Sequence, residues 1–427
     1  MRILILGNGA REHVFAWRIS QSAGCEKLFI ANGNAGTASC GENISLDLKD
    51  FNSIVEFCVE NEIDMVLPGN EDPLVMGITD YLEKAIPGIL VAGPSQKGAQ
   101  LEGSKDFAKE FMLKHNIPTA RFSTFTAKTL SRGLQFLETL QAPYVLKADG
   151  LAAGKGVLIC ATLEEAKNSL SEMLENKKFG EASQKVVIEE FLHGIELSCF
   201  VLTDGTNYMI LPEAKDYKRI GENDTGLNTG GMGAVSPVPF ADTKFLRKVE
   251  EEVIIPTIKG LKSDRIPYKG FIFFGLMNCN GEPSVIEYNC RMGDPETEVV
   301  FARVNNDLVE LLKATCTKKL HTITPNVSPN YATTIFTVSG GYPEEYKVDK
   351  AIENLEKITD CLVFHAGTKT NETGKIYTSG GRVIAFTALG NTLPEALAKS
   401  NAAAETVSFD GKYFRKDIGK DLLKYID

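Results

Sequence analysis

The first part of the chain alternates short apolar runs with amphipathic stretches. The apolar runs cover residues 2–6, 28–31, 65–68 and 89–93, and helical patterns lie between them, notably at 50–61 and 73–85. Alternation of this kind is typical of a parallel sheet with helices on both faces. We therefore expect residues 1–103 to form a doubly wound α/β domain.

A second pattern, over about 120–192, predicts a small α+β unit with a glycine-rich loop in its middle. Strand patterns at 121–125, 144–148, 157–160 and 185–190 alternate with helical patterns at 130–140 and 162–175. Lys147 stands near the end of the second strand, and Gly150, Gly154, Lys155 and Gly156 follow it. Glycine lets backbone N–H groups approach phosphate oxygens and lysine adds charge, so a mobile lid over an anion is favoured. A hairpin loop with incidental lysines is the alternative.

The loop does not follow the Walker A pattern. Only three residues separate Gly150 from Gly154, and Gly156 stands where Ser or Thr should hold magnesium. If the loop binds phosphate, its geometry differs from that of a P-loop.

Acidic residues gather where this unit ends. Glu189 and Glu190 close an apolar strand, and Glu196 enters the next strand shortly after Leu192. A linker between two lobes can present backbone groups to an adenine edge and a carboxylate to ribose hydroxyls. A solvated strand end is the alternative interpretation.

Residues 211–235 show neither helical nor strand periodicity. Lysines and an arginine lie beside Asp216, and a glycine run that includes Gly230 and Gly231 follows. Long irregular segments inside compact domains are usually functional or disordered. We expect an irregular substrate loop here, with disorder as the alternative.

A hairpin follows a helical pattern at about 243–261. Asn280-Gly281 separates two apolar runs, which is a strong hairpin signal. The period of a strand puts Val285, Glu287 and Asn289 on one face, with Glu287 and Asn289 about 6.6 Å apart. Their oxygens suit a hard cation such as Mg²⁺ and not zinc, because no His or Cys joins them there. An exposed strand face is the alternative.

The rest of the chain reads as a compact α+β closing domain. A sharp turn at 291–296 leads into a helical pattern from about 297 to 315, and later patterns predict strands at 331–338 and 381–388 and a helix at 393–406. We place the domain boundaries at 1–103, 104–322 and 323–427.

The segment Gly7-Asn8-Gly9 invites comparison with a dinucleotide-binding fingerprint, but it fails. Glu12 takes the place of the third glycine, and the second strand ends in Ala31-Asn32 without an acidic residue for a ribose. This disfavours a nicotinamide-dependent oxidoreductase. Two interpretations of this segment remain: a phosphate-binding site at the helix N-terminus, assisted by Arg11, or a turn with only a structural role.

Composition narrows the class of protein. The net charge of −10, from 46 basic and 56 acidic residues, argues against a nucleic-acid binder. Nine cysteines without a C-x-x-C pair indicate reduced thiols in a cytoplasmic protein. No apolar run is long enough to span a membrane, so we expect no membrane association.

The glycine-lysine lid, the glutamate-rich linker and the Glu-x-Asn strand together resemble an ATP-grasp enzyme. The resemblance is closest to the phosphoribosylamine–glycine ligase family and rests on segments at 7–13, 101–105, 147–157, 228–233, 291–296 and 364–368, in order. The chain departs from the family at Asn70 and Asp72, and at Tyr217 where a His is usual. The resemblance implies a Rossmann-like substrate domain, a two-lobed ATP-grasp fold and a small C-terminal α+β domain.

The resemblance also implies a reaction. ATP, glycine and 5-phospho-D-ribosylamine would give ADP, phosphate and glycinamide ribonucleotide through glycyl phosphate, in purine synthesis, with Mg²⁺ or Mn²⁺. A monomer is expected by the same analogy. Another ATP-grasp ligase of purine synthesis, such as a carboxylase of aminoimidazole ribonucleotide, and a non-catalytic nucleotide sensor are the alternatives.

The resemblance further assigns site residues to four groups. Contacts to ATP are expected from Lys105, Lys147, Gly154, Lys155, Gly156, Glu189, Glu190, Leu192 and Glu196; metal ligands are Glu287 and Asn289; substrate contacts are Asn8, Gly9, Arg11, Asp216, Gly230, Gly231, Lys375 and Arg382; catalytic residues are Arg291 and Asp294.

Overall fold

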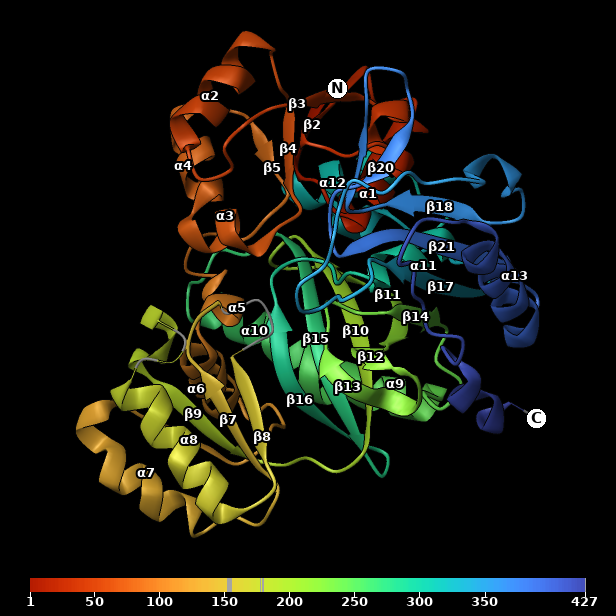
Figure 1. Ribbon diagram of the computed structural model, residues 1–427. Coiled ribbons are helices and arrows are strands. Elements are labelled where there is room, and N and C mark those ends of the chain that lie inside the picture. Colours follow the sequence, from red (N-terminus) through yellow and green to blue (C-terminus); the bar gives the residue numbers. More distant parts are fainter. Residues whose placement is uncertain (152–155, 177, 179, 427) are drawn as a thin grey trace.

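The computed structural model describes residues 1–151, 156–176, 178 and 180–426 (Figure 1). Its first sheet has five parallel strands in the order β3-β2-β1-β4-β5. The bounds are β1 (Arg2–Gly7), β2 (Lys27–Asn32), β3 (Glu42–Ile44), β4 (Met65–Pro68) and β5 (Leu90–Val91), with helices α1 (Ala10–Ser20), α2 (Phe51–Glu60), α3 (Glu71–Met76) and α4 (Ile78–Ala85).

Strand β1 shows why this sheet is covered on both sides. Ile3 and Ile5 pack into the core that contains Val14 of α1, whereas Leu4 and Leu6 pack into another core with α2 and α4. Successive side chains of a strand point to opposite faces, so an unbroken apolar run must be buried twice. The expected doubly wound architecture is confirmed.

The second sheet has eight strands and runs through the middle of the molecule. Its order is β16-β15-β10-β11-β14-β17-β21-β18, and all its neighbours are antiparallel. The bounds are β10 (Ile195–Thr203), β11 (Tyr208–Asp216), β14 (Gly233–Ser236), β15 (Gly270–Cys279), β16 (Glu282–Asn289), β17 (Tyr331–Val338), β18 (Leu362–His365) and β21 (Arg382–Gly390). The closing part of the chain therefore extends the sheet of the middle part.

The third sheet belongs to a lobe with its own core, at the lower left of Figure 1. Its order is β6-β9-β7-β8, with bounds β6 (Phe122–Phe125), β7 (Tyr144–Ala148), β8 (Val157–Cys160) and β9 (Val186–Glu190), covered by α7 (Leu130–Leu137) and α8 (Leu163–Glu175). The strands predicted for 120–192 are thus confirmed, and we call this lobe the lid. Residues 152–155, which include the predicted ATP contacts Gly154 and Lys155, lie outside the described residues.

Further elements connect or cover these sheets, or form two small two-stranded sheets. They are α5 (Gln100–Gly103), α6 (Lys105–Lys114), β12 (Arg219–Gly221), β13 (Thr225–Asn228), α9 (Thr243–Lys248), a π-helical turn (Val249–Ile254), α10 (Ile255–Ser263), α11 (Glu296–Arg303), α12 (Leu308–Cys316), β19 (Thr368–Thr370), β20 (Ile376–Thr378), α13 (Leu393–Thr406) and the terminal 3₁₀ turn η8 (Lys420–Tyr425). None of the described helices is long and apolar enough to cross a membrane.

Three expectations from the sequence were wrong. The helical pattern at 73–85 is two helices, α3 and α4, because the chain turns at Gly77, which has a φ of +96°. Residues 211–235 are not irregular: the end of β11, the hairpin β12–β13 and β14 occupy them, and strands of three or four residues are too short to show a period. The single helix expected from 297 to 315 is two helices. Asp307 caps α12 by accepting hydrogen bonds from the N–H groups of Val309 and Glu310, so the chain restarts there.

The first and last parts of the chain meet at two buried histidines. The backbone N–H of His365 donates to Nδ1 of His13 at 2.8 Å, and the side-chain amide of Asn34 donates to the carbonyl of His365 at 2.7 Å. Gly36 allows this contact, because a Cβ there would lie 2.1 Å from Cε1 of His13. Burial lowers the pKa of His13 to about 3 and that of His365 to about 4.

These pKa values predict a loss of stability in mild acid. Below the ordinary histidine pKa of 6.5, both histidines bind protons in the unfolded chain but stay neutral in the folded protein. The free energy of unfolding therefore falls as the pH decreases toward 4. Each histidine contributes up to about 1.4 kcal/mol per pH unit. His13→Gln should flatten this dependence in urea unfolding, whereas the exposed control His321→Gln should keep it. Equal pH slopes for His13→Gln and the unmodified chain would contradict the assignment.

Candidate active site

A cavity of about 750 Å³ lies between the lid and strands β15 and β16. Thirteen of the residues predicted from the sequence line it: Lys105, Lys147, Gly156, Glu189, Glu190, Leu192, Glu196, Asp216, Gly230, Glu287, Asn289, Arg291 and Asp294. Six described candidates do not: Asn8, Gly9, Arg11, Gly231, Lys375 and Arg382. The structure therefore brings together most of the residues expected around ATP and the metal, and fewer of those expected around the other substrates.

Lys147 is fixed beside a buried carboxylate. Its ammonium lies 2.9 Å from Oε1 of Glu189 and donates to the carbonyl of Ile286 at 3.2 Å. The other carboxylate oxygen of Glu189 lies 2.8 Å from the ammonium of Lys109, on α6. Burial opposes ionisation of Glu189, but the two lysines outweigh it and lower its pKa. Both carboxylate oxygens of Glu189 are therefore occupied by the ammonium groups of Lys147 and Lys109.

Lys109 was not predicted as a site residue. Its side chain is 2% exposed, and burial lowers its pKa to about 8 against the opposing charge of Glu189. One signal was present in the sequence: Lys109 follows Lys105 by four residues, which places both on one face of a helix.

Lys105 begins α6 and points toward the lid. Its ammonium donates to the carbonyl of Gly150 at 2.9 Å, and Gly150 has a φ of +123°, which favours glycine. Burial lowers the pKa of Lys105, and the nearby charge of Glu287 opposes this. Lys105 and Lys147 thus approach the cavity from opposite lobes, an arrangement suited to an anion held between them.

Glu287 and Asn289 occupy one face of β16, as the strand period predicted. Val285, expected on the same face, instead packs into a hydrophobic core with Tyr288. Glu287 pairs with Gly275 and Asn289 with Phe273, and a bulge at Ile286 separates this register from that of Val285. Gly275 leaves room for the carboxylate, since a Cβ there would lie 3.2 Å from Cγ of Glu287. The facing strand β15 carries no acidic residue.

This face of β16 could supply two of the ligands of a hard cation, but not the whole coordination shell. One carboxylate and one amide oxygen match the donor type of Mg²⁺, which usually takes its remaining ligands from water and substrate phosphates. Across the described residues there is no group of three His, Cys, Asp or Glu side chains that could hold a metal ion alone. The face therefore suits a metal that arrives with a phosphate.

Arg291, which follows this strand, is clamped by two carboxylates. Its guanidinium lies 3.1 Å from Oε2 of Glu71 and 2.8 Å from Oε1 of Glu102. The second oxygen of Glu102 accepts a hydrogen bond from the backbone N–H of Cys290 at 2.8 Å. Burial alone would lower the pKa of Arg291, but Glu102 and Glu71 reverse this and raise it. Arg291 is therefore a rigid cation at the cavity wall.

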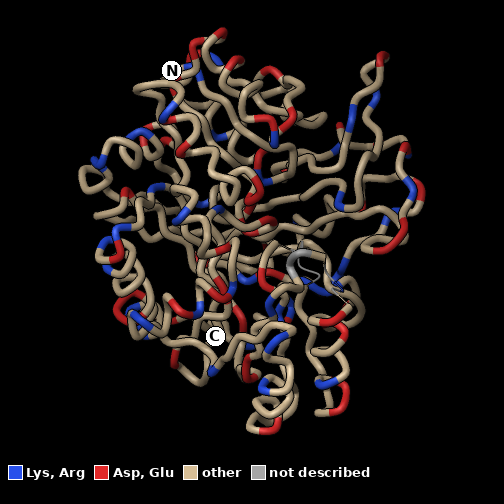
Figure 2. The backbone as a smooth tube through the Cα atoms, turned by 90° about the vertical axis from the view of Figure 1, so that its left-hand side faces the viewer, with Lys and Arg blue, Asp and Glu red and all other residues tan. Residues whose placement is uncertain are grey.

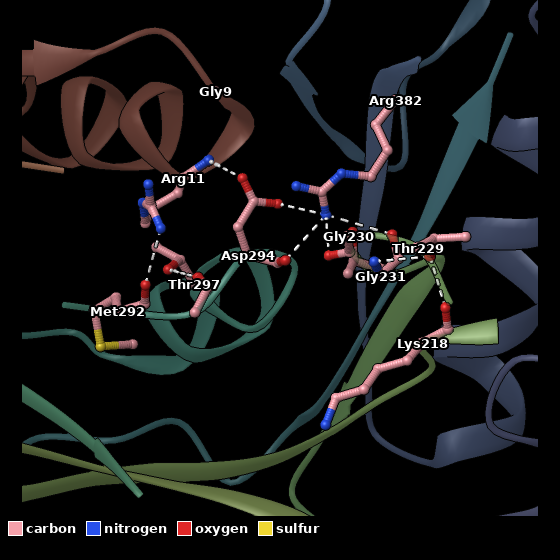
Figure 3. A network of polar contacts seen from close by, with 12 residues as sticks. Gly9, Arg11, Lys218, Thr229, Gly230, Gly231, Met292, Asp294, Thr297 and Arg382 are labelled. Carbon is pink, nitrogen blue, oxygen red and sulfur yellow. Dashed lines mark hydrogen bonds and ion pairs between the residues drawn. The ribbon is translucent and has the colours of Figure 1, made fainter. Parts of the chain in front are cut away.

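Asp294 joins three distant parts of the chain (Figure 3). Its Oδ1 lies 3.0 Å from the guanidinium of Arg382, and its Oδ2 accepts from the backbone N–H of Arg11 at 3.4 Å. Arg382 also donates to the carbonyl of Gly230 at 2.7 Å. Arg382 thus holds Gly230, which lines the cavity, while its own guanidinium stays outside the lining.

The N-terminal end of α1 is filled by side chains of the protein. Glu12 accepts from the backbone N–H of Gly9 at 2.6 Å and pairs with the guanidinium of Arg11 at 2.6 Å. Arg11 also donates to Oδ1 of Asn70 at 2.9 Å, so the departure at Asn70 has a structural role. Because carboxylates already supply negative charge at this helix end, Arg11 serves the protein's own contacts in this structure.

A cluster of opposite charges lies on the β11 side of the cavity. Lys218 lies 2.9 Å from Oε2 of Glu196 and 4.0 Å from Oδ2 of Asp216. The charge of Asp216 raises the pKa of Lys218, and the charge of Lys218 lowers the pKa of Glu196. Glu196 therefore presents an ionised carboxylate to the cavity.

The end of the chain also reaches the site. Asp421, Lys424 and Tyr425 of η8 are among the lining residues, which the sequence did not indicate. Tyr217 is 2% exposed and donates to Oδ1 of Asp421 at 2.5 Å, so the departure at Tyr217 anchors this turn. Lys375, in contrast, lies exposed between β19 and β20.

Charged residues of both signs are spread along the backbone in Figure 2. Basic and acidic residues are interspersed over the side that it shows, without a continuous basic stripe. A nucleic-acid binder typically carries such a stripe.

Comparison with known proteins places the chain in a family. Models of the N domain, the ATP-grasp (A) domain and the C domain of phosphoribosylglycinamide synthetase match residues 1–102, 103–297 and 332–421. The chain is 45% identical to a phosphoribosylamine–glycine ligase of Vibrio parahaemolyticus, over 98% of both chains. It is 44% identical to the bifunctional purine biosynthetic protein PUR2,5 of Pichia angusta, over 99% of this chain but only 54% of that protein.

Solved structures agree with this assignment. A phosphoribosylamine–glycine ligase from Thermotoga maritima superposes with a TM-score of 0.84 and 34% identity, covering 98% of this chain and all of the other. The biotin carboxylase domain of a 2-oxoglutarate carboxylase from Hydrogenobacter thermophilus, with a TM-score of 0.73 over 100% of this chain and 98% of the other, is 17% identical and shows only the shared fold. The chain belongs to the phosphoribosylglycinamide synthetase family, the membership that its sequence motifs predicted.

Proposed function

We propose that the chain is a phosphoribosylamine–glycine ligase. It joins glycine to 5-phospho-D-ribosylamine with ATP and forms glycinamide ribonucleotide, ADP and phosphate in purine synthesis. The observation that carries this proposal is the meeting of Lys105, Lys147, Glu287 and Asn289 around one cavity, in a chain similar to such ligases over nearly its whole length. Two lysines facing a carboxylate–amide pair suit a nucleotide triphosphate with its divalent cation.

In this proposal the glycine carboxylate attacks the γ-phosphate of ATP, and ADP leaves. The ribosylamine nitrogen then attacks the carbonyl carbon of glycyl phosphate, phosphate leaves with its bonding electrons, and the nitrogen loses a proton. The enzyme works mainly by holding the reactants in line and neutralising charge. Lys105 and Lys147 neutralise the phosphates, and the lid excludes water.

Mg²⁺ or Mn²⁺ would be held by Glu287 and Asn289, and the bound ion would offset the charge of the phosphate oxygens. Gly156, Glu190 and Leu192 are the described lid and linker residues that we assign to the nucleotide, with Glu196 at the ribose hydroxyls. The charge assigned to Glu196 is supported by its pairing with Lys218.

For the other substrates we assign Arg291 to the glycine carboxylate and Asp216 to its amine. Asp294, Arg382, Gly230 and Gly231 shape the neighbouring wall through the contacts described above. Asn8, Gly9, Arg11 and Lys375 lie outside the lining and stay predictions for the ribosylamine phosphate. We further propose a cytoplasmic monomer with domains at 1–103, 104–322 and 323–427.

The first test of this function is substrate omission. ADP release should require both glycine and freshly prepared phosphoribosylamine, and the product should carry the glycyl group on the ribosylamine nitrogen. Adding bicarbonate with aminoimidazole ribonucleotide in their place should give no ADP. Absence of ADP release with the full mixture would overturn the proposal.

A second test removes the charge of the proposed metal ligand. Glu287→Gln keeps the side-chain volume but loses the carboxylate, so turnover should fall by at least about 100-fold, as losses of charge stabilisation do. The matched control is Glu282→Gln on the same strand, whose side chain is 64% exposed. Both variants should melt near the temperature of the unmodified enzyme. Undiminished turnover in Glu287→Gln would refute the metal assignment.

A further inference from the structure

Lys109 touches both crossings of the chain between the lid and the body of the molecule. The chain enters the lid just after Thr119 and leaves it at the end of β9, which contains Glu189. The Lys109 ammonium donates to Oγ1 of Thr119 at 2.7 Å and lies 2.8 Å from Oε2 of Glu189. Lys109 itself lies on α6, outside the lid sheet, so one buried cation ties both hinge segments to the body.

Each residue that contacts Lys109 leads, through a further hydrogen bond, to one of two neighbouring carbonyls of β16. Oγ1 of Thr119 donates to the carbonyl of Val285 at 2.7 Å. Glu189 holds Lys147, whose ammonium donates to the carbonyl of Ile286 at 3.2 Å. The two accepting carbonyls are consecutive and sit at the bulge of β16, directly before Glu287.

The bulge in β16 determines the direction in which the side chain of Glu287 points. Gly275 faces Glu287, whereas the next residue of β15, Leu276, faces Val285, so Ile286 is the extra residue of β16. A bulge re-aims the side chains next to it, and its backbone groups lack the regular ladder partners. Hydrogen bonds from Thr119 and Lys147 to the carbonyls of the bulge therefore restrain its conformation.

We propose that Lys109 is a positioning residue that couples the orientation of the lid to the placement of Glu287 and Lys147. The inference rests on the proposed function, since it assigns Glu287 to the metal and Lys147 to the phosphates. Lys109 acts through two branches: one through Thr119 to Val285, and one through Glu189 and Lys147 to Ile286. Groups that orient metal ligands from behind change metal affinity or activity by roughly 10- to 100-fold when removed.

The two branches predict different results for two variants. Thr119→Val keeps the shape of the side chain and leaves Lys147 with Glu189, so ADP binding without metal should stay unchanged. The Mg²⁺ concentration needed for tight ADP binding should rise severalfold in that variant. Lys109→Met removes the two contacts from which both branches start. It should therefore weaken ADP binding in EDTA and also raise the Mg²⁺ requirement, by roughly tenfold. Lys109→Arg should restore part of both losses.

The measurement is calorimetric titration with ADP at a series of Mg²⁺ concentrations, beside the thermal midpoint of each ligand-free variant. Lys114→Met is the matched control, because it makes the same substitution on the same helix at a side chain that is 62% exposed. The control should bind ADP like the unmodified protein. A merely structural role would lower the thermal midpoint of the Lys109 and Thr119 variants without changing the Mg²⁺ requirement of the folded protein.

An unchanged Mg²⁺ requirement in both Thr119→Val and Lys109→Met would overturn the inference. If Lys109→Met does not fold, Thr119→Val alone decides, since it removes only a hydroxyl. ADP binding needs neither glycine nor phosphoribosylamine, so the result stands apart from the ligase assay. Absence of ligation by the unmodified protein would overturn the proposed function, whereas an active enzyme with unchanged Mg²⁺ dependence would overturn the positioning role alone.

Discussion

The buried carboxylate of Glu189, shared by Lys109 and Lys147, is the contact on which the geometry of the cavity depends. A lysine taken out of water loses hydration that only a close opposite charge and hydrogen bonds can replace. Glu189 is 3% exposed, Lys109 2% and Lys147 4%, so none of the three can turn to solvent for compensation. The three side chains can be buried together but not singly. Lys147 and Glu189 belong to the lid, whereas Lys109 belongs to α6 in the body of the molecule.

The other walls of the cavity rely on similar pairings between distant segments. Glu71 and Glu102 hold Arg291 from the first part of the chain, and Asp294 meets Arg382 from the last part. Each pairing leaves a charged group at the cavity with a fixed direction. Preorganised charge of this kind needs little rearrangement when substrates bind.

The sequence predicted those features whose signal is local. Strand alternation identified the doubly wound sheet and the lid strands, and the period of two put Glu287 and Asn289 on one face. The partners of Arg291 and Arg11 could not be predicted in this way, because Glu102 and Asn70 are brought to them by tertiary packing. Lys109 was missed for the same reason: its acceptors, Thr119 and Glu189, belong to segments that the helix pattern does not specify.

The continuity of the eight-stranded sheet has a consequence for the order of folding. Strand β14 pairs with β17, about a hundred residues later, and Gly233 permits this approach because a Cβ would lie 2.5 Å from the carbonyl of Thr334. Until β17 is synthesised, β14 offers an unpaired edge, and such edges invite pairing with other chains. During translation the growing sheet therefore keeps an unpaired edge, first at β14 and then at β17, until β21 is made and pairs with β17. A truncation before residues 331–338 would leave the edge of β14 exposed permanently.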